Sequence, residues 1–335
     1  ERFYGRRPRE KQLVSSAVRM FDASDVTVAI PTYGREQILL DTIQALLDQQ
    51  KPPGDVLVVD QTPEHELDTV ARLAVWEDAG RIRTIRRDIA SQPGAMNCAL
   101  VAAKTPLVLF VDDDIVPRPD LVERHAKAHR TDDVWAVVGQ ILQPGEDPVD
   151  CVPDPVNGHF RNHLDFRFSC ARECWVRNCM SGNLSVRREE ALEIGGFDEN
   201  FCLTVAYRFD SEFGRRIWKR GGKVRFDPSA SLRHLRASRG GTRTGPDHLR
   251  SHRPDHSIGD YYFALLHGVN RESLGYIASR LFRSVATRFH LRHPWWIAPK
   301  LLGECRGLVG AVRLAAGGQK LLASCVRGEE AKDSK

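Results

Sequence analysis

Strand-like runs alternate with helical patterns over the first 112 residues, and this alternation restricts the fold more than any other feature. The strand-like runs are apolar or alternate in polarity and cover 26–33, 55–60, 81–87 and 106–112. The segments between them have apolar residues at helical spacing and cover 35–50, 64–79 and 94–104. Strands that alternate with helices at this interval form βαβ units. We therefore expect an α/β fold, with a mostly parallel central sheet and helices on both faces.

The second half of the chain has shorter elements followed by a helical region. Residues 143–162 are rich in Pro, Gly, Asp and Asn and lack an apolar period, so we expect a loop there. Residues 180–201 predict a strand, a short helix and a glycine turn. Residues 210–222 predict an amphipathic helix, and residues 223–235 predict two short strands. The chain is helical and basic from about residue 245. These changes predict an N-terminal extension, an α/β domain and a helical, basic C-terminal region, at 1–24, 25–244 and 245–335.

The composition is that of a globular protein. Of the 335 residues, 41% are apolar and 28% are charged, which is sufficient for a sizeable core. No apolar run reaches the roughly 18–20 residues of a spanning helix, and the opening ERFYGRRPRE is unlike a signal peptide. The eight cysteines include no CxxC pair, so we expect free thiols and no zinc site. Together these features predict a cytoplasmic protein.

Charge is distributed unevenly along the chain. The net charge is +5, but residues 236–335 alone carry 17 Lys and Arg against 8 Asp and Glu. The acidic first part argues against a nucleic-acid groove spread over the whole protein, so no nucleic-acid partner is expected. The basic remainder predicts a partner with phosphate groups or an anionic surface.

Three consecutive aspartates, Asp112 to Asp114, follow the fourth predicted strand. Adjacent carboxylates repel one another, so this cluster requires either a neutralising cation or full solvation in a turn. Ligands of open α/β sheets bind at the carboxyl ends of the strands. Residues 31–33 and Asp60 end the first two strands, so we expect them at the same edge as the aspartates. The placement favours a ligand site over a solvated turn.

Several motifs in order along residues 25–240 resemble those of the family 2 inverting glycosyltransferases. The motifs are IPTY, VVD, FVDDD, SGNLSVRR, GGFDENF and FDSEF, with a later His234. The resemblance implies a nucleotide-diphospho-sugar transferase fold with residues 25–244 as the catalytic domain. It also implies metal-dependent transfer of a sugar, with inversion, from a nucleoside-diphosphate sugar to a hydroxyl of a glycan or lipid-linked acceptor.

The resemblance assigns roles to residues at the ends of the strands. Asp114 is expected to ligate Mg²⁺ or Mn²⁺, which stabilises the leaving diphosphate as a Lewis acid. Asp112 and Asp113 are expected to serve the nucleotide ribose and the surroundings of the metal. His234 matches a histidine that contacts metal or phosphate, although a purely structural histidine is an equal alternative.

The base of the nucleotide is expected at the first two strand ends. Asp60 matches the residue that accepts a hydrogen bond from the base, because a carboxylate suits a ring N–H donor. The other expected contacts to the donor nucleotide are Pro31, Thr32, Tyr33 and Asn97. Met96 stands where the family often has an arginine before that asparagine.

Inversion requires a base that takes the proton of the acceptor hydroxyl. Asp210 is the expected base and Glu212 the second candidate, while Phe209 replaces the glutamate that is usual in the family. Asp198 is expected either to contact the acceptor or to cap a turn. The basic loop with Arg236, Arg239 and Arg243 is expected either to close over the diphosphate or to remain solvated.

Other readings of these features remain open. A nucleotidyltransferase would need a glycine- and lysine-rich loop after the first strand, where this chain has PTYGRE. A degenerate nucleotide- or glycan-binding module is the non-enzymatic alternative, and Phe209 is the one feature in its favour. The apolar stripe within 274–289 and the Trp295–Trp296 pair predict docking on the anionic inner face of the cell membrane. The alternative is that these helices pack against the catalytic domain or a second subunit.

Overall fold

The computed structural model describes a central sheet flanked by helices, with further helices at the C-terminal side. The described residues are 20–151, 164–202, 205, 207–241, 249–255, 257–266, 268 and 270–322. The strands are β1 Val26–Thr32, β2 Asp55–Asp60, β3 Arg83–Arg86, β4 Leu107–Val111, β5 Ile115–Pro117, β6 Val134–Leu142, β7 Cys174–Val176, β8 Asn183–Arg187 and β9 Lys223–His234. Their order in the sheet is β3-β2-β1-β4-β8-β6-β9-β5, and β7 pairs with β9.

The sheet is mixed but mostly parallel, which confirms the predicted fold class. Strands β3, β2, β1 and β4 are mutually parallel, whereas β8 runs antiparallel to both β4 and β6. The chain leaves β1 for β2 on one side and returns to β4 on the other, so the strand order reverses beside β1. Such a switch point is where open α/β sheets bind their ligands. The carboxyl ends of β1 and β4 therefore define the candidate site.

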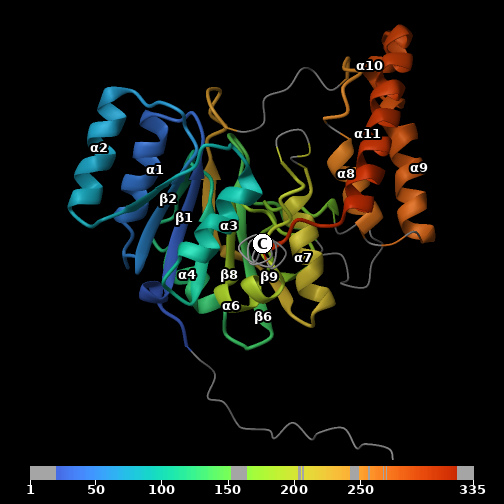
Figure 1. Cartoon of the computed structure of the whole chain (residues 1–335). Coiled ribbons are helices and arrows are strands. Elements are labelled where there is room, and N and C mark those ends of the chain that lie inside the picture. The colour runs from blue at the N-terminus through green and yellow to red at the C-terminus, as the bar shows by residue number, and fades with distance from the viewer. Residues whose placement is uncertain are drawn as a thin grey trace, which may run out of the picture.

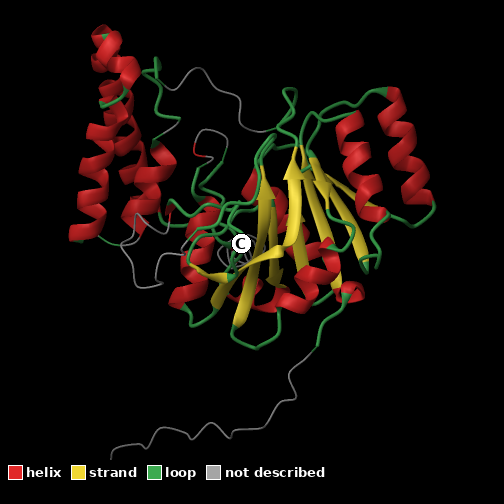
Figure 2. Cartoon of the chain, turned by 180° about the vertical axis from the view of Figure 1, so that it is seen from behind, coloured by secondary structure: helices red, strands yellow, loops and turns green. Residues whose placement is uncertain are grey.

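Helices cover both faces of the sheet (Figures 1 and 2). Those of the α/β part are α1 Gln37–Leu47, α2 Leu67–Asp78, α3 Gln92–Ala102, α4 Leu121–Ala128, α6 Arg188–Glu193 and α7 Phe209–Lys219. Alternate residues of β1 point to opposite faces: Val28 and Ile30 pack in one buried cluster and Ala29 in the other. Burial on both faces is why these strands read as nearly continuous apolar runs.

The C-terminal helices stand beside the α/β part and share its core (Figure 1). They are α8 Ile258–Leu266, α9 Arg271–Val285, α10 Arg288–Arg292, the short 3-10 helix η3 Pro294–Trp296 and α11 Ile297–Gly317. Tyr261 and Tyr262 of α8 lie in the same buried cluster as Phe197 and Phe213. Among the described helices, none has both the length and the apolar character needed to cross a bilayer. The domain bounds predicted from the sequence stay a prediction.

Three expectations about local structure differ from what is observed. The two short strands predicted over 223–235 are one strand, β9, which pairs with β6 across a register shift near Gly139. The helical pattern over 272–289 divides at Thr287, whose hydroxyl caps the start of α10. The expectation that all cysteines are free is wrong, because Cys151 and Cys170 form a disulfide with Cα atoms 5.7 Å apart. The disulfide removes the support that free thiols gave to a cytoplasmic location.

Candidate active site

Side chains that are far apart in the sequence meet beside the ends of β1 and β4. Asp112, Asp113 and Asp114 follow β4, and His234 ends β9. Strand β5 carries the chain away from the aspartates and pairs antiparallel with β9, with Ile115 opposite His234. This pairing brings His234 beside the aspartates, 120 residues later in the chain than Asp114.

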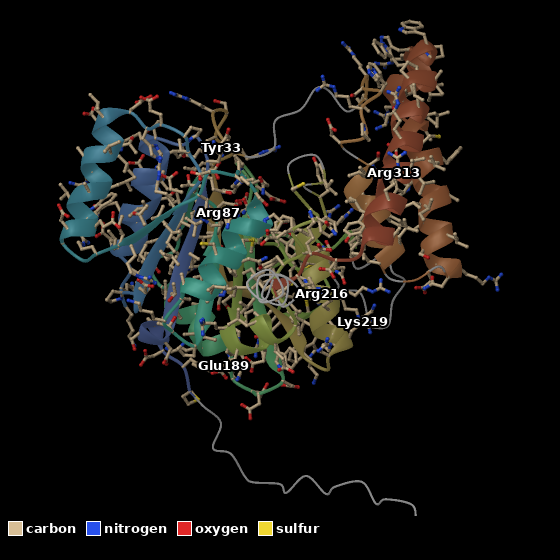
Figure 3. All side chains as sticks on the ribbon, viewed as in Figure 1. Tyr33, Arg87, Glu189, Arg216, Lys219 and Arg313 are labelled. Carbon is tan, nitrogen blue, oxygen red and sulfur yellow. A yellow bond between two sulfur atoms is a disulfide. The ribbon has the colours of Figure 1, made fainter. Side chains whose placement is uncertain are left out.

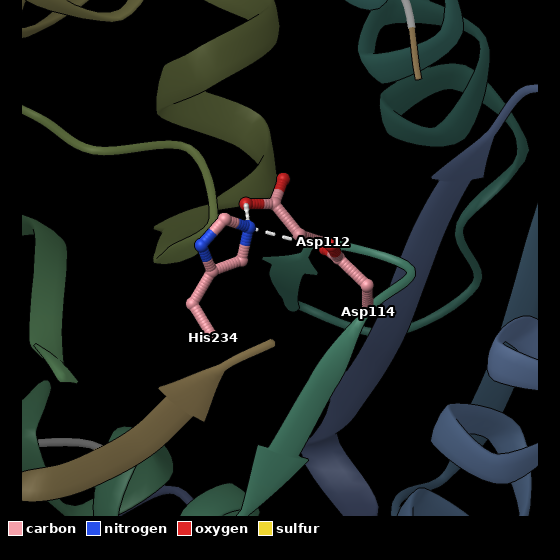
Figure 4. Close-up of side chains that lie close together, drawn as sticks. All are labelled: Asp112, Asp114 and His234. Carbon is pink, nitrogen blue, oxygen red and sulfur yellow. Dashed lines mark ion pairs between the residues drawn. The ribbon is translucent and has the colours of Figure 1, made fainter. Parts of the chain in front are cut away.

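Asp112, Asp114 and His234 form a cluster suited to a metal ion (Figure 4). One ligand atom from each lies within 4.8 Å of those of the other two. His234 Nε2 is 3.1 Å from Asp114 Oδ1 and 3.8 Å from Asp112 Oδ2. Asp114 is buried, while Asp112 and His234 are partly exposed, so the cluster is reachable from solvent. The structure thus groups Asp112 with the two expected metal ligands.

Asp114 and His234 change one another's pKa. The hydrogen bond with Asp114 raises the pKa of His234. Burial acts to raise the pKa of Asp114, but hydrogen bonds from His234 and the Ala237 amide outweigh it and hold that pKa below its ordinary value. Asp114 is therefore ionised and aims Oδ1 toward the cluster, while its other oxygen is occupied elsewhere.

Asp113 points away from this cluster, toward the buried end of β1. It accepts hydrogen bonds from Thr32 Oγ1 at 2.7 Å and from Arg35 Nε at 3.1 Å. Burial raises the pKa of Asp113 to about 6, even though the Arg35 charge opposes that rise. Asp113 is thus bonded to Thr32 and Arg35 and is not a member of the cluster of Asp112, Asp114 and His234.

Arg35 is a site residue that the sequence analysis did not identify. Its Nη2 lies 3.3 Å from Asp114 Oδ2, and its Nη1 donates to the carbonyls of Ala237 and Arg239. Arg35 is buried, so its charge is balanced by the two aspartates that it contacts. The only available signal was a charged residue directly after the first strand, in PTYGRE.

The start of the basic loop lies against the end of β1. The Gly241 amide donates to the Tyr33 carbonyl at 2.8 Å. Gly240 has φ +81°, and a Cβ atom there would collide with the Gly34 carbonyl oxygen. The Arg239 side chain reaches outward to Glu66 at 3.1 Å, and Arg243 lies outside the described residues. Figure 3 shows Tyr33 at this edge, far from Arg313 on the C-terminal helices.

Gly182 lies against Asp112 of the candidate cluster, and its neighbour Ser181 contacts Asp210 at the start of α7. A Cβ atom at Gly182 would collide with Asp112 Oδ2, so this glycine allows the carboxylate to lie against the backbone. The preceding amide, that of Ser181, donates to Asp210 Oδ2 at 3.4 Å. Asp112 and Asp210 therefore lie on either side of the Ser181–Gly182 segment. The role of this glycine was not recognised in the SGN motif.

Asp210 and Glu212 have different surroundings at the start of α7. Asp210 also accepts a hydrogen bond from the Ser211 amide at 2.8 Å. Glu212 is buried and paired with Arg216 at 2.6 Å, and it accepts a hydrogen bond from Gln319 Nε2 at 2.9 Å. The Glu212 carboxylate is thus held by a cation and an amide inside the fold.

Asp60 and Asn97, both expected at the nucleotide, form hydrogen bonds within the protein. Asp60 is buried and accepts hydrogen bonds from the Thr62 amide, His65 and Arg86. The Asn97 amide group bonds to the backbone N–H and carbonyl of Phe197 and to the Glu199 carboxylate. Pro31 and Thr32 are buried and Tyr33 is partly exposed. The nucleotide-binding roles of these residues stay predictions.

Asp198, expected at the acceptor, lies in a buried network with the C-terminal segment. Its oxygens accept hydrogen bonds from Tyr262 Oη at 2.8 Å, the Lys320 amide at 3.0 Å and Gln319 Nε2 at 3.2 Å. The Asn200 amide is a further donor, which is the turn-capping arrangement foreseen as the alternative. Contact with an acceptor stays a prediction.

Known proteins resemble this chain in sequence. The family profile described as glycosyl transferase family 2 matches residues 27–195. The chain is 26% identical over 242 residues to chondroitin synthase from Escherichia coli, covering 62% of the chain and 34% of that protein. It is also 26% identical over 187 residues to a glucosyl-dolichyl phosphate glucuronosyltransferase from Haloferax volcanii, covering 52% of the chain and 56% of that protein. The chain therefore spans about one third and just over one half of the length of these relatives.

Solved structures of similar fold extend the comparison. A mannosyltransferase from Pyrobaculum calidifontis, in complex with GDP-Man and Mn²⁺, has a TM-score of 0.51 at 19% identity and covers 95% of this chain and 84% of its own. GalNAc-T7 with UDP, GalNAc and Mn²⁺ also has a TM-score of 0.51, at 14% identity, and covers 66% and 44%. Likeness at these identities shows the shared fold.

Proposed function

Because the chain belongs to glycosyl transferase family 2, we propose that it transfers a sugar from a nucleoside-diphosphate sugar to an acceptor hydroxyl, with inversion and with a divalent cation. The acceptor in this proposal is a glycan or a lipid-linked glycan. The observation that carries the proposal is the meeting of Asp112, Asp114 and His234 at the switch point of the sheet, with Asp210 across the Ser181–Gly182 segment. Two similar structures bind nucleotides and Mn²⁺, which supports the choice of donor and cation.

The donor set fits a divalent cation. Two carboxylates suit Mg²⁺ and Mn²⁺ equally, but Mg²⁺ prefers oxygen ligands throughout, so coordination by His234 favours Mn²⁺. When bound, the cation neutralises the charge that develops on the leaving diphosphate. Arg35 holds Asp114 Oδ2, which leaves Oδ1 on the side of His234 and the cluster. We assign the ligand role to Asp112, Asp114 and His234.

Asp210 is the proposed base. The acceptor oxygen forms the new bond to the anomeric carbon while the bond to the diphosphate oxygen breaks, and Asp210 takes the hydroxyl proton. Glu212 is less suited to this task, because Arg216 and Gln319 already bind its oxygens. Other residues are proposed to form the pocket for the donor nucleotide, either by contacting the nucleotide or by positioning residues that do. They are Asp60, Asn97, Asp113 and residues 31–33.

A donor panel tests the proposal. Nucleoside-diphosphate sugars are incubated with the protein in Mn²⁺, in Mg²⁺ and in EDTA, and release of nucleoside diphosphate is measured. We expect release with one donor class, greater with Mn²⁺, absent in EDTA and lost in Asp114→Asn and His234→Gln. Asp147→Asn, which removes an exposed carboxylate, is the control. Equal release in EDTA would contradict the metal assignment, and nucleotide binding without release from any donor would favour a binding module.

We also propose that the C-terminal helices dock on the anionic inner face of the cell membrane. The predicted stripe divides in the structure: Ile277 is buried against the core, whereas Leu274 is exposed. Phe282, which lies outside that stripe, is exposed as well. Leu291 and Trp295 are exposed nearby on α10 and η3. Exposed apolar and basic side chains together suit an anionic interface.

Vesicle co-sedimentation at low salt tests this docking. We expect the protein to sediment with anionic vesicles and not with neutral ones, and Phe282→Ser and Trp295→Ser to weaken the binding. Val75→Ser, at an exposed apolar position of α2, is the matched control. Equal sedimentation of all variants would contradict the proposal.

A further inference from the structure

A polar cavity lies between the loop that precedes α7 and the C-terminal helices. Its volume is about 390 Å³, and its lining includes Arg208 before α7, Asp260 of α8, Arg283 of α9 and Lys300 of α11. This volume is enough for a substituted phosphate group. Arg208 is two residues before the proposed base Asp210 in the chain, so the cavity lies beside the start of α7.

The cavity walls contain more positive than negative charge. Among the described lining residues, four are Arg or Lys and three are Asp or Glu. Asp260 is compensated by Arg208 Nε at 2.6 Å and by Arg280, which contacts its other oxygen. Glu304 is compensated by Arg280 Nε at 3.2 Å and Lys300 Nζ at 2.9 Å. The two buried carboxylates thus share three cations, and the excess charge is positive.

Arg283 is the lining cation that no described carboxylate pairs with: it is partly exposed, and its Nε donates to the Ser279 carbonyl at 3.3 Å. An anionic ligand with several acceptor oxygens pairs with such a guanidinium through charge-assisted hydrogen bonds. Arg208 adds backbone strain, because it has φ +76° and is not a glycine. Strain of this kind concentrates at functional sites. Ser284 and Thr287 also line the cavity, and their hydroxyls are bonded to the Leu281 carbonyl and to His290.

The same helices carry exposed apolar side chains beyond the cavity. Phe282 is 72% exposed and is the immediate neighbour of Arg283 on α9. Leu291 is 81% exposed and Trp295 is 65% exposed, and both follow shortly after Thr287 in the chain. The polar cavity thus lies near exposed apolar side chains. A ligand with an anionic head and a long apolar tail matches this pair of surfaces better than a polar acidic glycan does.

We propose that this cavity binds the phosphate group of a lipid-linked acceptor, whose apolar chain lies over Phe282, Leu291 and Trp295. The inference rests on the proposed transferase function, since it names the acceptor class for that reaction. Arg208, Arg283 and Lys300 hold the phosphate, which places the sugar end of the acceptor toward Asp210.

Binding measurements in EDTA test the inference, because the metal cluster then holds no cation to attract phosphate. The probes are farnesyl phosphate, farnesol, inorganic phosphate and glucuronic acid, titrated by calorimetry into the full chain. We expect farnesyl phosphate to bind more tightly than any other probe. Loss of one charge-assisted contact in Arg283→Gln or Lys300→Gln should weaken its binding by about ten- to a hundredfold. Arg313→Gln, an exposed change on α11, should leave the binding unchanged.

Each contrary outcome has a distinct meaning. Equal binding of farnesol and farnesyl phosphate, or equal binding by Arg283→Gln and the unaltered protein, overturns the phosphate site. Tighter binding of glucuronic acid than of farnesyl phosphate overturns the lipid acceptor in favour of an acidic glycan. Thermal melting establishes that each variant is folded, and Arg283→Gln, on a partly exposed residue, provides the test if Lys300→Gln does not fold. Donor hydrolysis by the unaltered protein in Mn²⁺ tests the transferase function separately.

Discussion

The guanidinium of Arg35 lies 3.3 Å from the Asp114 carboxylate, so a cation built into the chain compensates part of the negative charge at the candidate metal site. Its Nε is 3.1 Å from Asp113, and all three side chains are buried. Asp113 and Asp114 are therefore partly compensated before any metal binds, because both contact Arg35 and Asp113 also accepts a hydrogen bond from the Thr32 hydroxyl of β1.

Replacing Arg35 should lower stability and, in the folded protein, raise the affinity for a cation, because it removes the positive charge that lies beside Asp114. Arg35→Gln leaves a buried aspartate without its cation, which costs about 3–5 kcal/mol in unfolding free energy. Arg35→Lys should lose less, since it keeps the charge but not the fork that reaches both carboxylates. Chemical denaturation and Mn²⁺ titration measure the two effects. Arg118→Gln, which breaks an exposed ion pair with Asp120, is the matched control, and equal behaviour of the two glutamine variants would contradict the role of Arg35.

Asp210→Asn should lose transfer by about a hundredfold or more while keeping donor binding, if Asp210 is the base. Glu212→Gln should instead lower stability, because it removes the charge that pairs with Arg216 inside the fold. Turnover per folded molecule and nucleotide affinity separate the two effects. A folded Glu212→Gln without activity, beside an active Asp210→Asn, would exchange the two roles.

Gly182→Ala should weaken cation binding without a change of charge, because the new Cβ displaces the Asp112 carboxylate from its position against the backbone. We expect a Mn²⁺ affinity at least several-fold lower, measured by titration calorimetry. Gly275→Ala is the control: it lies within α9, a Cβ there meets no atom within 4 Å, and alanine favours helix by about 0.5–1 kcal/mol. Unchanged Mn²⁺ affinity in Gly182→Ala would show that Asp112 is not a ligand.

Two buried histidines, His125 in α4 and His129 directly after it, should make stability depend on pH. His125 bonds to Asn183 and Ser185, and burial lowers its pKa to about 4; burial lowers the pKa of His129 to about 3. The unfolded chain therefore binds more protons below pH 6.5, so these groups reduce stability as the pH falls. At pH 5 the loss is about 2 kcal/mol for each histidine.

Urea unfolding at pH 7 and pH 5 measures this loss. The double variant His125→Gln/His129→Gln should be less stable at pH 7 but should change less between the two pH values. Asp113, whose pKa burial raises to about 6, acts in the opposite direction, but its effect cancels when the variant is compared with the unaltered chain. His252→Gln, at an exposed position, is the control. An equal pH difference in all three proteins would contradict the assignment to these two histidines.

Local patterns were sufficient to predict the parallel part of the sheet, β1 to β4, and its functional edge, whereas β5, β6 and β7 were not predicted. The runs that became β1, β2 and β4 are apolar because both of their faces are covered. Once the strands are parallel, their carboxyl ends must share an edge, so Asp60 and Asp112 to Asp114 were placed correctly at that edge. His234 was recognised only through the family motifs, because its position depends on the pairing of β5 with β9.

Features that depend on distant segments were not predictable from one sequence. Arg35 resembles a solvated turn residue until the carbonyls of Ala237 and Arg239, more than 200 residues later, enclose it. The disulfide joins Cys151 to Cys170 across a loop without a recognisable spacing motif. The stripe on α9 was predicted as one surface, but Ile277 is buried in the core and Leu274 is exposed.

The bonds of Gln319 to Asp198 and Glu212 also affect how the protein is made. Gln319 follows Glu212 by 107 residues in the chain, so a ribosome makes Glu212, and the still earlier Asp198, well before the side-chain amide that binds them. At translation rates of about 5–20 residues per second, the delay is roughly 5–20 s. During this interval both carboxylates lack a donor that they have in the finished fold. The nascent chain thus completes the bonds of Glu212, two residues from the proposed base Asp210, only after Gln319 beyond α11 has been made.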